Sequence, residues 1–146
     1  MNRTLACTLL LLSATWNVAA QPGVQLSHIE ANVPSQDNFE TLLKRDLLAF
    51  MRVQGGPSAT RVEYKLLRDG PTQSGVAYPK FYAWVQAFAG AQLISEGVVR
   101  LAAVERQRFD VTDYVRAKEV RANPDSVRAI FPKVLVPVIL ERAGGK

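Results

Sequence analysis

Residues 81–88 are apolar on both faces of an extended chain: Phe81-Tyr82-Ala83-Trp84-Val85-Gln86-Ala87-Phe88. The large side chains of Tyr82, Trp84 and Phe88 share one face, and Phe81 shares the other with smaller residues. A strand of this kind lies inside a sheet that is covered on both sides. We therefore predict a central strand, packed against a helix on one face and against another segment on the other.

The segments on either side of this stretch predict further strands. Residues 61–66, Arg61-Val62-Glu63-Tyr64-Lys65-Leu66, alternate charged with apolar side chains, as in a strand with one face in water. A third strand is expected from about Leu93 to Phe109, with a bulge at Gly97 because its polar and apolar positions change phase. Together these segments predict a three-stranded antiparallel meander.

Helices are expected before and after the meander. The first is predicted to begin near Asp37, whose side chain would cap it together with Glu40, and to stop at Gly55-Gly56-Pro57. Its apolar stripe recurs at steps of three and four residues: Phe39, Leu42, Leu43, Leu47 and Phe50. The residues before it, 21–33, are weakly patterned and are predicted to be extended.

Two short helices are predicted at the C-terminal end. Asn123-Pro124 provides a capping side chain followed by proline at the first helical position. Their apolar residues are Val127, Ile130 and Phe131, and then Val134, Leu135, Val138 and Ile139. The predicted fold class is thus α+β, a helix packed on a three-stranded meander with short helices after it. This order of elements resembles cystatin-like and nuclear-transport-factor-like folds, which host unrelated functions.

The polar segment 68–80 is the main candidate binding site. Loops on a rigid scaffold commonly carry binding residues, and glycines at positions 70 and 75 let backbone amides approach a ligand. Ser74 has neither a Gly-x-Ser-x-Gly elbow nor a lysine at Ser-x-x-Lys spacing, so binding is favoured over nucleophilic catalysis. The side chains expected to gather at this end of the sheet are Arg68, Asp69, Thr72, Gln73, Ser74, Tyr78 and Lys80.

Two alternative functions remain open. Asp69 or Asp113 beside the aromatic residues of the central strand would provide the general base of a small pocket enzyme. Residues 86–90, Gln86-Ala87-Phe88-Ala89-Gly90, resemble the Gln-x-Val-x-Gly hairpin with which cystatins bind cysteine-protease clefts. Gly23 matches the N-terminal glycine of that pattern, Phe88 replaces the valine, and the later Pro-Trp hairpin is absent. The resemblance implies a protease inhibitor.

Metal, cofactor and nucleic-acid chemistry are not predicted. His28 is the only histidine, whereas a histidine-based metal site needs two or three. Asp110 and Asp113 lack the spacing of a calcium loop, and we expect them to lie in a turn. Basic residues are in excess from Arg100 onward, but acidic residues alternate with them, which is typical of a solvated surface rather than a nucleic-acid interface.

The first twenty residues predict export. Met1-Asn2-Arg3 carries one positive charge, an apolar run follows, and Val18-Ala19-Ala20 presents the small side chains that signal peptidase requires. Cleavage after Ala20 would leave residues 21–146 as one domain. Because it would also remove Cys7, that domain would contain no thiol or disulfide. We therefore expect a soluble binding or accessory protein of the bacterial envelope, periplasmic or secreted, with an unidentified protein, peptide or small-molecule partner and no integral membrane segment.

Overall fold

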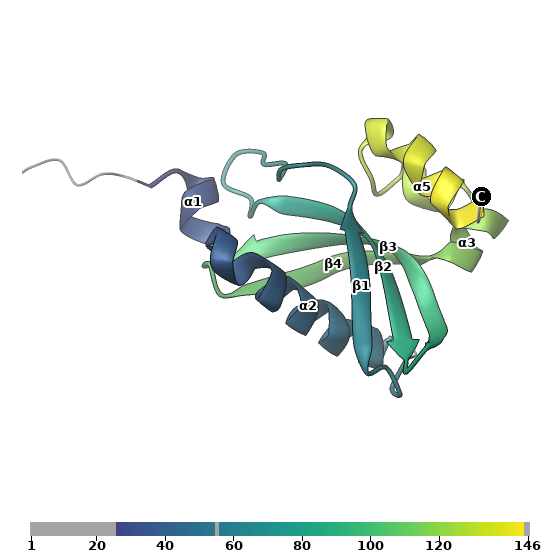
Figure 1. Ribbon diagram of the computed structural model, residues 1–146. Coiled ribbons are helices and arrows are strands. Elements are labelled where there is room, and N and C mark those ends of the chain that lie inside the picture. Colours follow the sequence, from purple (N-terminus) through teal and green to yellow (C-terminus); the bar gives the residue numbers. More distant parts are fainter. Residues whose placement is uncertain (1–25, 55, 145–146) are drawn as a thin grey trace, which may run out of the picture.

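A computed structural model of the 146-residue chain describes residues 26–54 and 56–144. It shows an α+β fold in which a four-stranded antiparallel sheet lies between two layers of helices (Figure 1). The expected signal peptide, its cleavage site at Ala20 and Gly23 all lie outside the described residues. The elements in chain order are α1 (His28–Asn32), α2 (Gln36–Val53), β1 (Arg61–Leu66), β2 (Lys80–Ala89), β3 (Gln92–Val104), β4 (Arg108–Arg116), α3 (Ala117–Ala122), α4 (Asp125–Arg128), the 3-10 helix η1 (Lys133–Leu135) and α5 (Val136–Gly144).

The predicted central strand is confirmed as β2. The strand order is β1-β2-β3-β4, so each strand pairs with its neighbour in the sequence. Ala83 of β2 faces Leu66 of β1 on one side and Val99 of β3 on the other. Residues 81–85 are buried throughout, because a helical layer covers each face of the sheet.

The sheet has four strands rather than the three expected, because the predicted third strand is a hairpin. β3 ends at Val104 and the chain reverses through Glu105 and Arg106, which have φ values of 51° and 62°. Three residues, 105–107, connect Val104 to its register partner Arg108, and Gln107 N–H donates to the Val104 carbonyl at 3.0 Å. Positive φ at both central residues of such a four-residue turn is the conformation of a type I′ turn. Glycine or asparagine normally occupies such positions, and neither is present here.

Gly97 marks a close approach of two strands rather than the expected bulge. The irregularities in strand register lie between Ala87 and Phe88 and between Arg100 and Leu101. A Cβ atom on Gly97 would come within 2.4 Å of the Val115 carbonyl oxygen. Glycine is therefore needed at this position because no larger residue fits between β3 and β4.

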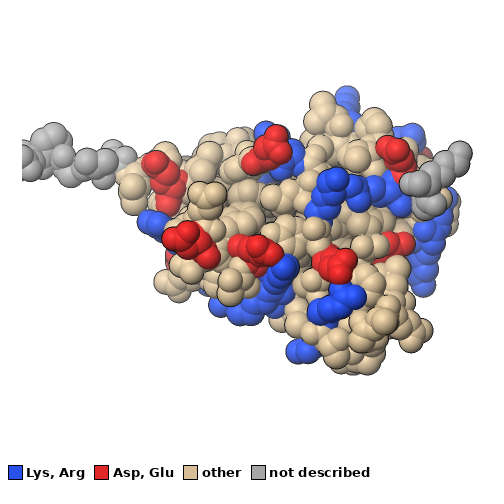
Figure 2. Space-filling view, viewed as in Figure 1, with Lys and Arg blue, Asp and Glu red and all other residues tan. Residues whose placement is uncertain are grey.

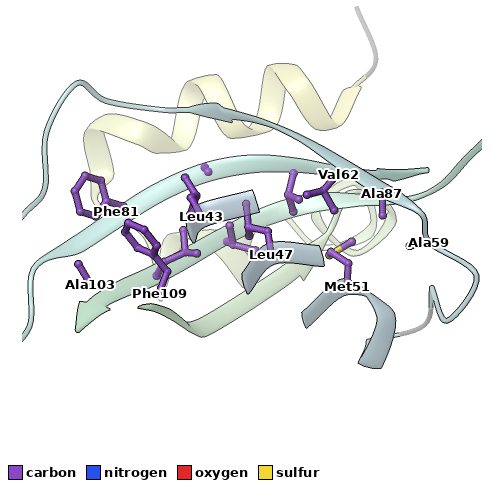
Figure 3. Packing of buried hydrophobic residues seen from close by; sticks show 13 residues of the cluster. Leu43, Leu47, Met51, Ala59, Val62, Phe81, Ala87, Ala103 and Phe109 are labelled. Carbon is purple, nitrogen blue, oxygen red and sulfur yellow. The ribbon is translucent and has the colours of Figure 1, made fainter. Parts of the chain in front are cut away.

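The predicted amphipathic helix is confirmed as α2, and it packs on one face of the sheet. Leu43, Leu47 and Met51 point toward the strands and lie among buried residues such as Phe81 and Phe109 (Figure 3). The helix begins two residues earlier than expected. Its N-cap is Ser35 rather than Asp37, so the predicted capping pair of Asp37 and Glu40 does not form.

The opposite face of the sheet is covered by α3, α4 and α5. Tyr82 and Trp84 of β2 lie in a second hydrophobic cluster with Val127 of α4, Ile139 of α5 and Phe131 of the segment between α4 and η1. The two predicted C-terminal helical segments are thus confirmed, and α3 is an additional one. Val134, which was expected to face inward, is 79% exposed.

The N-terminal segment is helical where an extended chain was expected. α1 begins with a reciprocal capping box, in which Ser27 Oγ accepts from Glu30 N–H and the Glu30 carboxylate accepts from Ser27 N–H. The hydrogen bond with the Ser27 backbone, and to a smaller extent the one with its side chain, lowers the pKa of Glu30. Asn32, at the end of α1, is buried and connects the helix to the β3–β4 turn. Its Oδ1 accepts from Glu105 N–H at 3.0 Å and its carbonyl accepts from Arg106 N–H at 2.8 Å.

Acidic and basic side chains are interspersed over the face of the molecule shown in Figure 2. Within residues 26–54 and 56–144, no helix has both the length and the apolar character needed to cross a membrane.

Candidate binding site

The candidate loop between β1 and β2 is fastened at its base. Thr72 and Lys80 form an isolated β-bridge, with N–H···O distances of 2.8 and 2.7 Å in the two directions. The Thr72 hydroxyl also lies 2.7 Å from the hydroxyl of Tyr82, which is buried in the sheet. These bonds hold the base of the loop against β2, so its tip projects from a fixed position.

The tip of the loop is a turn that presents an apolar side chain. Gly75 has a φ of 55°, and Ala77 N–H donates to the Ser74 carbonyl at 3.1 Å. Gln73 stabilises the same turn by donating to the Gly75 carbonyl at 3.1 Å. The turn places Val76 at 93% exposure, the highest among the large hydrophobic residues that the structure describes. Sequence analysis missed Val76, because candidates were selected by polarity.

Helix α1 lies beside the loop and extends this surface. The rings of His28 and Tyr78 are stacked with centroids 6.2 Å apart and planes inclined by 18°. Tyr78 remains 42% exposed, and Leu26 and Ile29 on the α1 side are 56% and 37% exposed. The His28–Tyr78 stack joins the two elements, and we call the side chains around it the α1–loop surface: Leu26, His28, Ile29, Val76 and Tyr78.

The polar residues predicted for the site are only partly brought together. Thr72 and Lys80 face each other across the β-bridge, and Arg68, Gln73 and Ser74 are exposed around the loop. Asp69 lies on the other side of the loop, where it lines an open hollow of about 400 Å³ between the loop and α2. The arrangement is a polar margin around an apolar tip, which is the usual composition of a protein-binding surface.

The carboxylates considered for catalysis lie in different environments. Asp110 and Asp113 are part of β4 rather than of the turn that was expected. Asp113 forms an ion pair with Arg100 at 2.6 Å, and Arg100 also donates to the Ile130 carbonyl at 3.3 Å, which connects the sheet to the C-terminal helices. Asp69 is exposed on the loop. Asp69 is therefore a surface residue, and Asp113 is part of an ion pair that links elements of the fold.

The aromatic residues of β2 do not line one pocket. Phe81 packs with the α2 layer and makes an edge-to-face contact with Phe109, whereas Tyr82 and Trp84 pack with the C-terminal helices. Strict alternation on a central strand sends neighbouring side chains to opposite faces. These rings belong to two separate hydrophobic clusters.

The hairpin that resembles the cystatin motif is tied to the neighbouring loop. Gln86 donates to Glu96 across β2 and β3 at 3.0 Å, and Arg61 lies 4.0 Å above the ring of Phe88. At the turn, Gly90 N–H donates to the Thr60 hydroxyl at 3.2 Å. The glutamine and phenylalanine of the motif are therefore engaged within the sheet.

Comparisons with known proteins do not narrow the choice of function. No family model, no curated protein and no solved structure matches this chain. In the part of the chain that the structure describes, no three histidine, cysteine or carboxylate side chains are grouped as metal ligands would be.

Proposed function

We propose that the protein is an exported binding or accessory protein of the bacterial envelope, which holds a peptide or protein partner on the α1–loop surface. The export part of the proposal rests on the charged start, apolar run and small-residue cleavage site of residues 1–20. We also propose that the helix followed by a meander is of the cystatin-like or nuclear-transport-factor-like type. This likeness implies no particular partner.

The observation that carries the binding proposal is the exposure of Val76. A valine that is 93% exposed gains nothing from folding, yet the turn that presents it is held by several hydrogen bonds. Burial of its side chain on a partner would remove apolar surface from water. The polar residues around it, including Gln73 and Ser74, suit the margin of the same interface.

The proposal also accounts for the rigid base of the loop. Binding is weakened when a flexible loop has to be ordered, and a loop held in one conformation avoids much of that cost. The Thr72–Lys80 bridge and the Thr72–Tyr82 hydroxyl contact fix the loop at β2. Stacking of His28 on Tyr78 joins it to α1.

The test is affinity capture from a periplasmic extract with the wild-type protein and with the variant Val76→Asp. Val53→Asp is the matched control, because Val53 is 82% exposed at the far end of α2. A second variant replaces Gln73 and Ser74 by alanine. We expect a partner that is recovered with wild type and Val53→Asp and lost with Val76→Asp. Equal recovery with all variants would show that the loop does not bind it.

A further inference from the structure

The two edges of the sheet differ in whether side chains hydrogen-bond to their outward backbone groups. At the β4 edge, Asp46 of α2 accepts a hydrogen bond from Phe109 N–H at 2.7 Å, and Arg45 donates to the Gln107 carbonyl at 2.9 Å. Side chains of α2 thus occupy backbone groups that an added strand would need. At the β1 edge, no side chain among the described residues hydrogen-bonds to the backbone of 61–66. An edge with free backbone groups is a template for another strand.

The free groups on β1 can be identified from the register. Arg61 pairs with Phe88, and Leu67 N–H donates to the Tyr82 carbonyl at 2.9 Å in the same register. Alternate residues of an antiparallel edge strand point their N–H and C=O groups toward the neighbour or away from it. The odd-numbered residues are therefore bonded to β2. Val62, Tyr64 and Leu66 direct their backbone groups outward.

The side chains of β1 give this edge two distinct faces. On the α2 side, Tyr64 and Leu66 are only partly buried. Two open hollows of about 400 and 450 Å³ lie along that side of β1, one lined by Leu66 and Phe39 and the other by Val62 and Leu48. On the other face, the exposed residues of β1 are charged with alternating sign: Arg61, Glu63 and Lys65.

We propose that β1 pairs with β1 of a second copy of this chain, antiparallel and about a two-fold axis at Tyr64, to form a continuous eight-stranded sheet. In this register Glu63 lies opposite Lys65 of the second copy, and the pairing occurs twice. On the α2 side, Val62 lies opposite Leu66 and the two Tyr64 rings adjoin. All outward backbone groups of the three even-numbered residues then find partners.

The charge pattern of β1 favours a second copy of this chain as the strand that pairs with its edge. Lysine on an edge strand ordinarily prevents pairing, because like charges are brought together. The order positive, negative, positive along β1 is self-complementary when the strand meets itself antiparallel at Tyr64. Lys65 has no carboxylate within ion-pair distance among the described residues, and the exposed Glu63 carboxylate contacts only Arg61 of its own strand, which leaves its second oxygen for Lys65 of the other copy. A two-fold axis at Val62 would instead use Thr60, whose N–H already donates to the Phe88 carbonyl at 2.8 Å.

The test is the association state of the purified chain, measured by sedimentation equilibrium with wild type and three variants. Glu63→Lys and Lys65→Glu each place like charges opposite one another twice, so we expect the dimer dissociation constant to rise about tenfold in each. The double variant with both changes restores opposite charges, and it is expected to return to within about threefold of wild type. Both residues are exposed, and thermal melting will confirm that each variant folds.

Disulfide formation between introduced cysteines tests the register separately, in a chain whose own Cys7 is replaced by serine (Cys7→Ser). Tyr64→Cys brings two cysteines opposite one another at the two-fold axis and is expected to give a disulfide-linked dimer. Leu66→Cys separates its two copies by several residues along the strands and is expected to stay unlinked. A wild-type chain that remains monomeric at about 1 mM overturns the proposal. A double variant that stays as weak as the single ones overturns it too.

Discussion

Replacement of Gly97 by alanine provides a direct test of the fold. The residue sits on β3 opposite Arg116 of β4, with its α-carbon against the neighbouring strand. A Cβ atom added there would lie 2.4 Å from the Val115 carbonyl oxygen, 2.7 Å from Tyr114 Cε2 and 2.9 Å from Arg116 Cα. Atoms do not approach so closely without repulsion, so the strands must separate or shift.

The size of the effect follows from which atoms must move. Two of the three contacts are to backbone, so relief requires β4 to shift, which strains the pairing of Val98 with Val115. Overpacking of a core costs about 1–3 kcal/mol, and a contact with backbone lies near the upper end. Alanine also reduces the entropy of the unfolded chain, which offsets about 0.5 kcal/mol. We expect a net loss of about 2.5 kcal/mol in the free energy of unfolding.

Thermal and urea unfolding followed by circular dichroism measure this loss. At about 4 °C per kcal/mol for a domain of this size, Gly97→Ala should melt roughly 10 °C below wild type. Gly70→Ala is the matched control, because a Cβ there meets no atom within 4 Å and the backbone is not left-handed. Its effect should stay within about 0.5 kcal/mol. If Gly97→Ala has the same melting temperature as Gly70→Ala, the close approach of β3 and β4 is refuted.

Two further predictions concern Asn32 and Tyr114. Asn32→Ala removes the acceptor of Glu105 N–H and the donor to the His28 carbonyl. We expect the free energy of unfolding, measured in urea, to fall by about 2 kcal/mol, and the Glu105 amide to exchange its hydrogen faster. Unchanged exchange at Glu105 would contradict the role of Asn32. Burial raises the pKa of Tyr114, so the folded state holds this proton more tightly than the unfolded state does. The resulting stability is complete below about pH 10 and lost as pH rises through the folded-state pKa. In urea unfolding, the free energy of unfolding of Tyr114→Phe should fall less between pH 10 and 11 than that of wild type. Equal losses would show that folding does not raise the pKa of Tyr114.

The elements that sequence analysis predicted correctly are those with a strong local pattern. The period of two in 61–66, the apolar run of 81–88 and the three-to-four period of α2 follow directly from which face of each element is buried. The start of the C-terminal helices near Pro124 is equally local, because proline and its preceding side chain are a start signal in themselves. α1 carried such a signal as well, in the spacing of Ser27 and Glu30.

The β3–β4 turn could not be predicted because a distant contact stabilises it. Glu105 and Arg106 are not residue types that favour positive φ at both central positions of a turn, and the left-handed backbone is unfavourable for both. Their N–H groups are held by Asn32, which lies 73 residues before Glu105 in the chain. A turn that depends on a tertiary hydrogen bond leaves no periodic or compositional signal. The fourth strand therefore appeared as a continuation of the third.

The candidate loop shows a similar division between local and distant information. Its position follows from its turn residues, but which side chains point outward depends on the Thr72–Lys80 bridge and on the stacking of Tyr78 against His28. These contacts join parts of the chain that sequence analysis treated separately. Polarity alone therefore selected Thr72 and Lys80, which face each other in the structure, and passed over Val76.

If both proposals hold, the α1–loop surface and the β1 edge serve different parts of the same binding event. Helices cover both faces of the sheet, and side chains of α2 bond to its β4 edge, so the loop and β1 are left as projecting or unsatisfied elements. Pairing through β1 uses residues 61–66 and leaves Val76, at the loop tip, outside the paired strands. A dimer of this kind would carry two loops on one rigid sheet. Two linked sites bind a multivalent or surface-bound partner about 10²–10⁴ times more tightly than one. Strand pairing would therefore strengthen binding at the loop without any change in the loop itself.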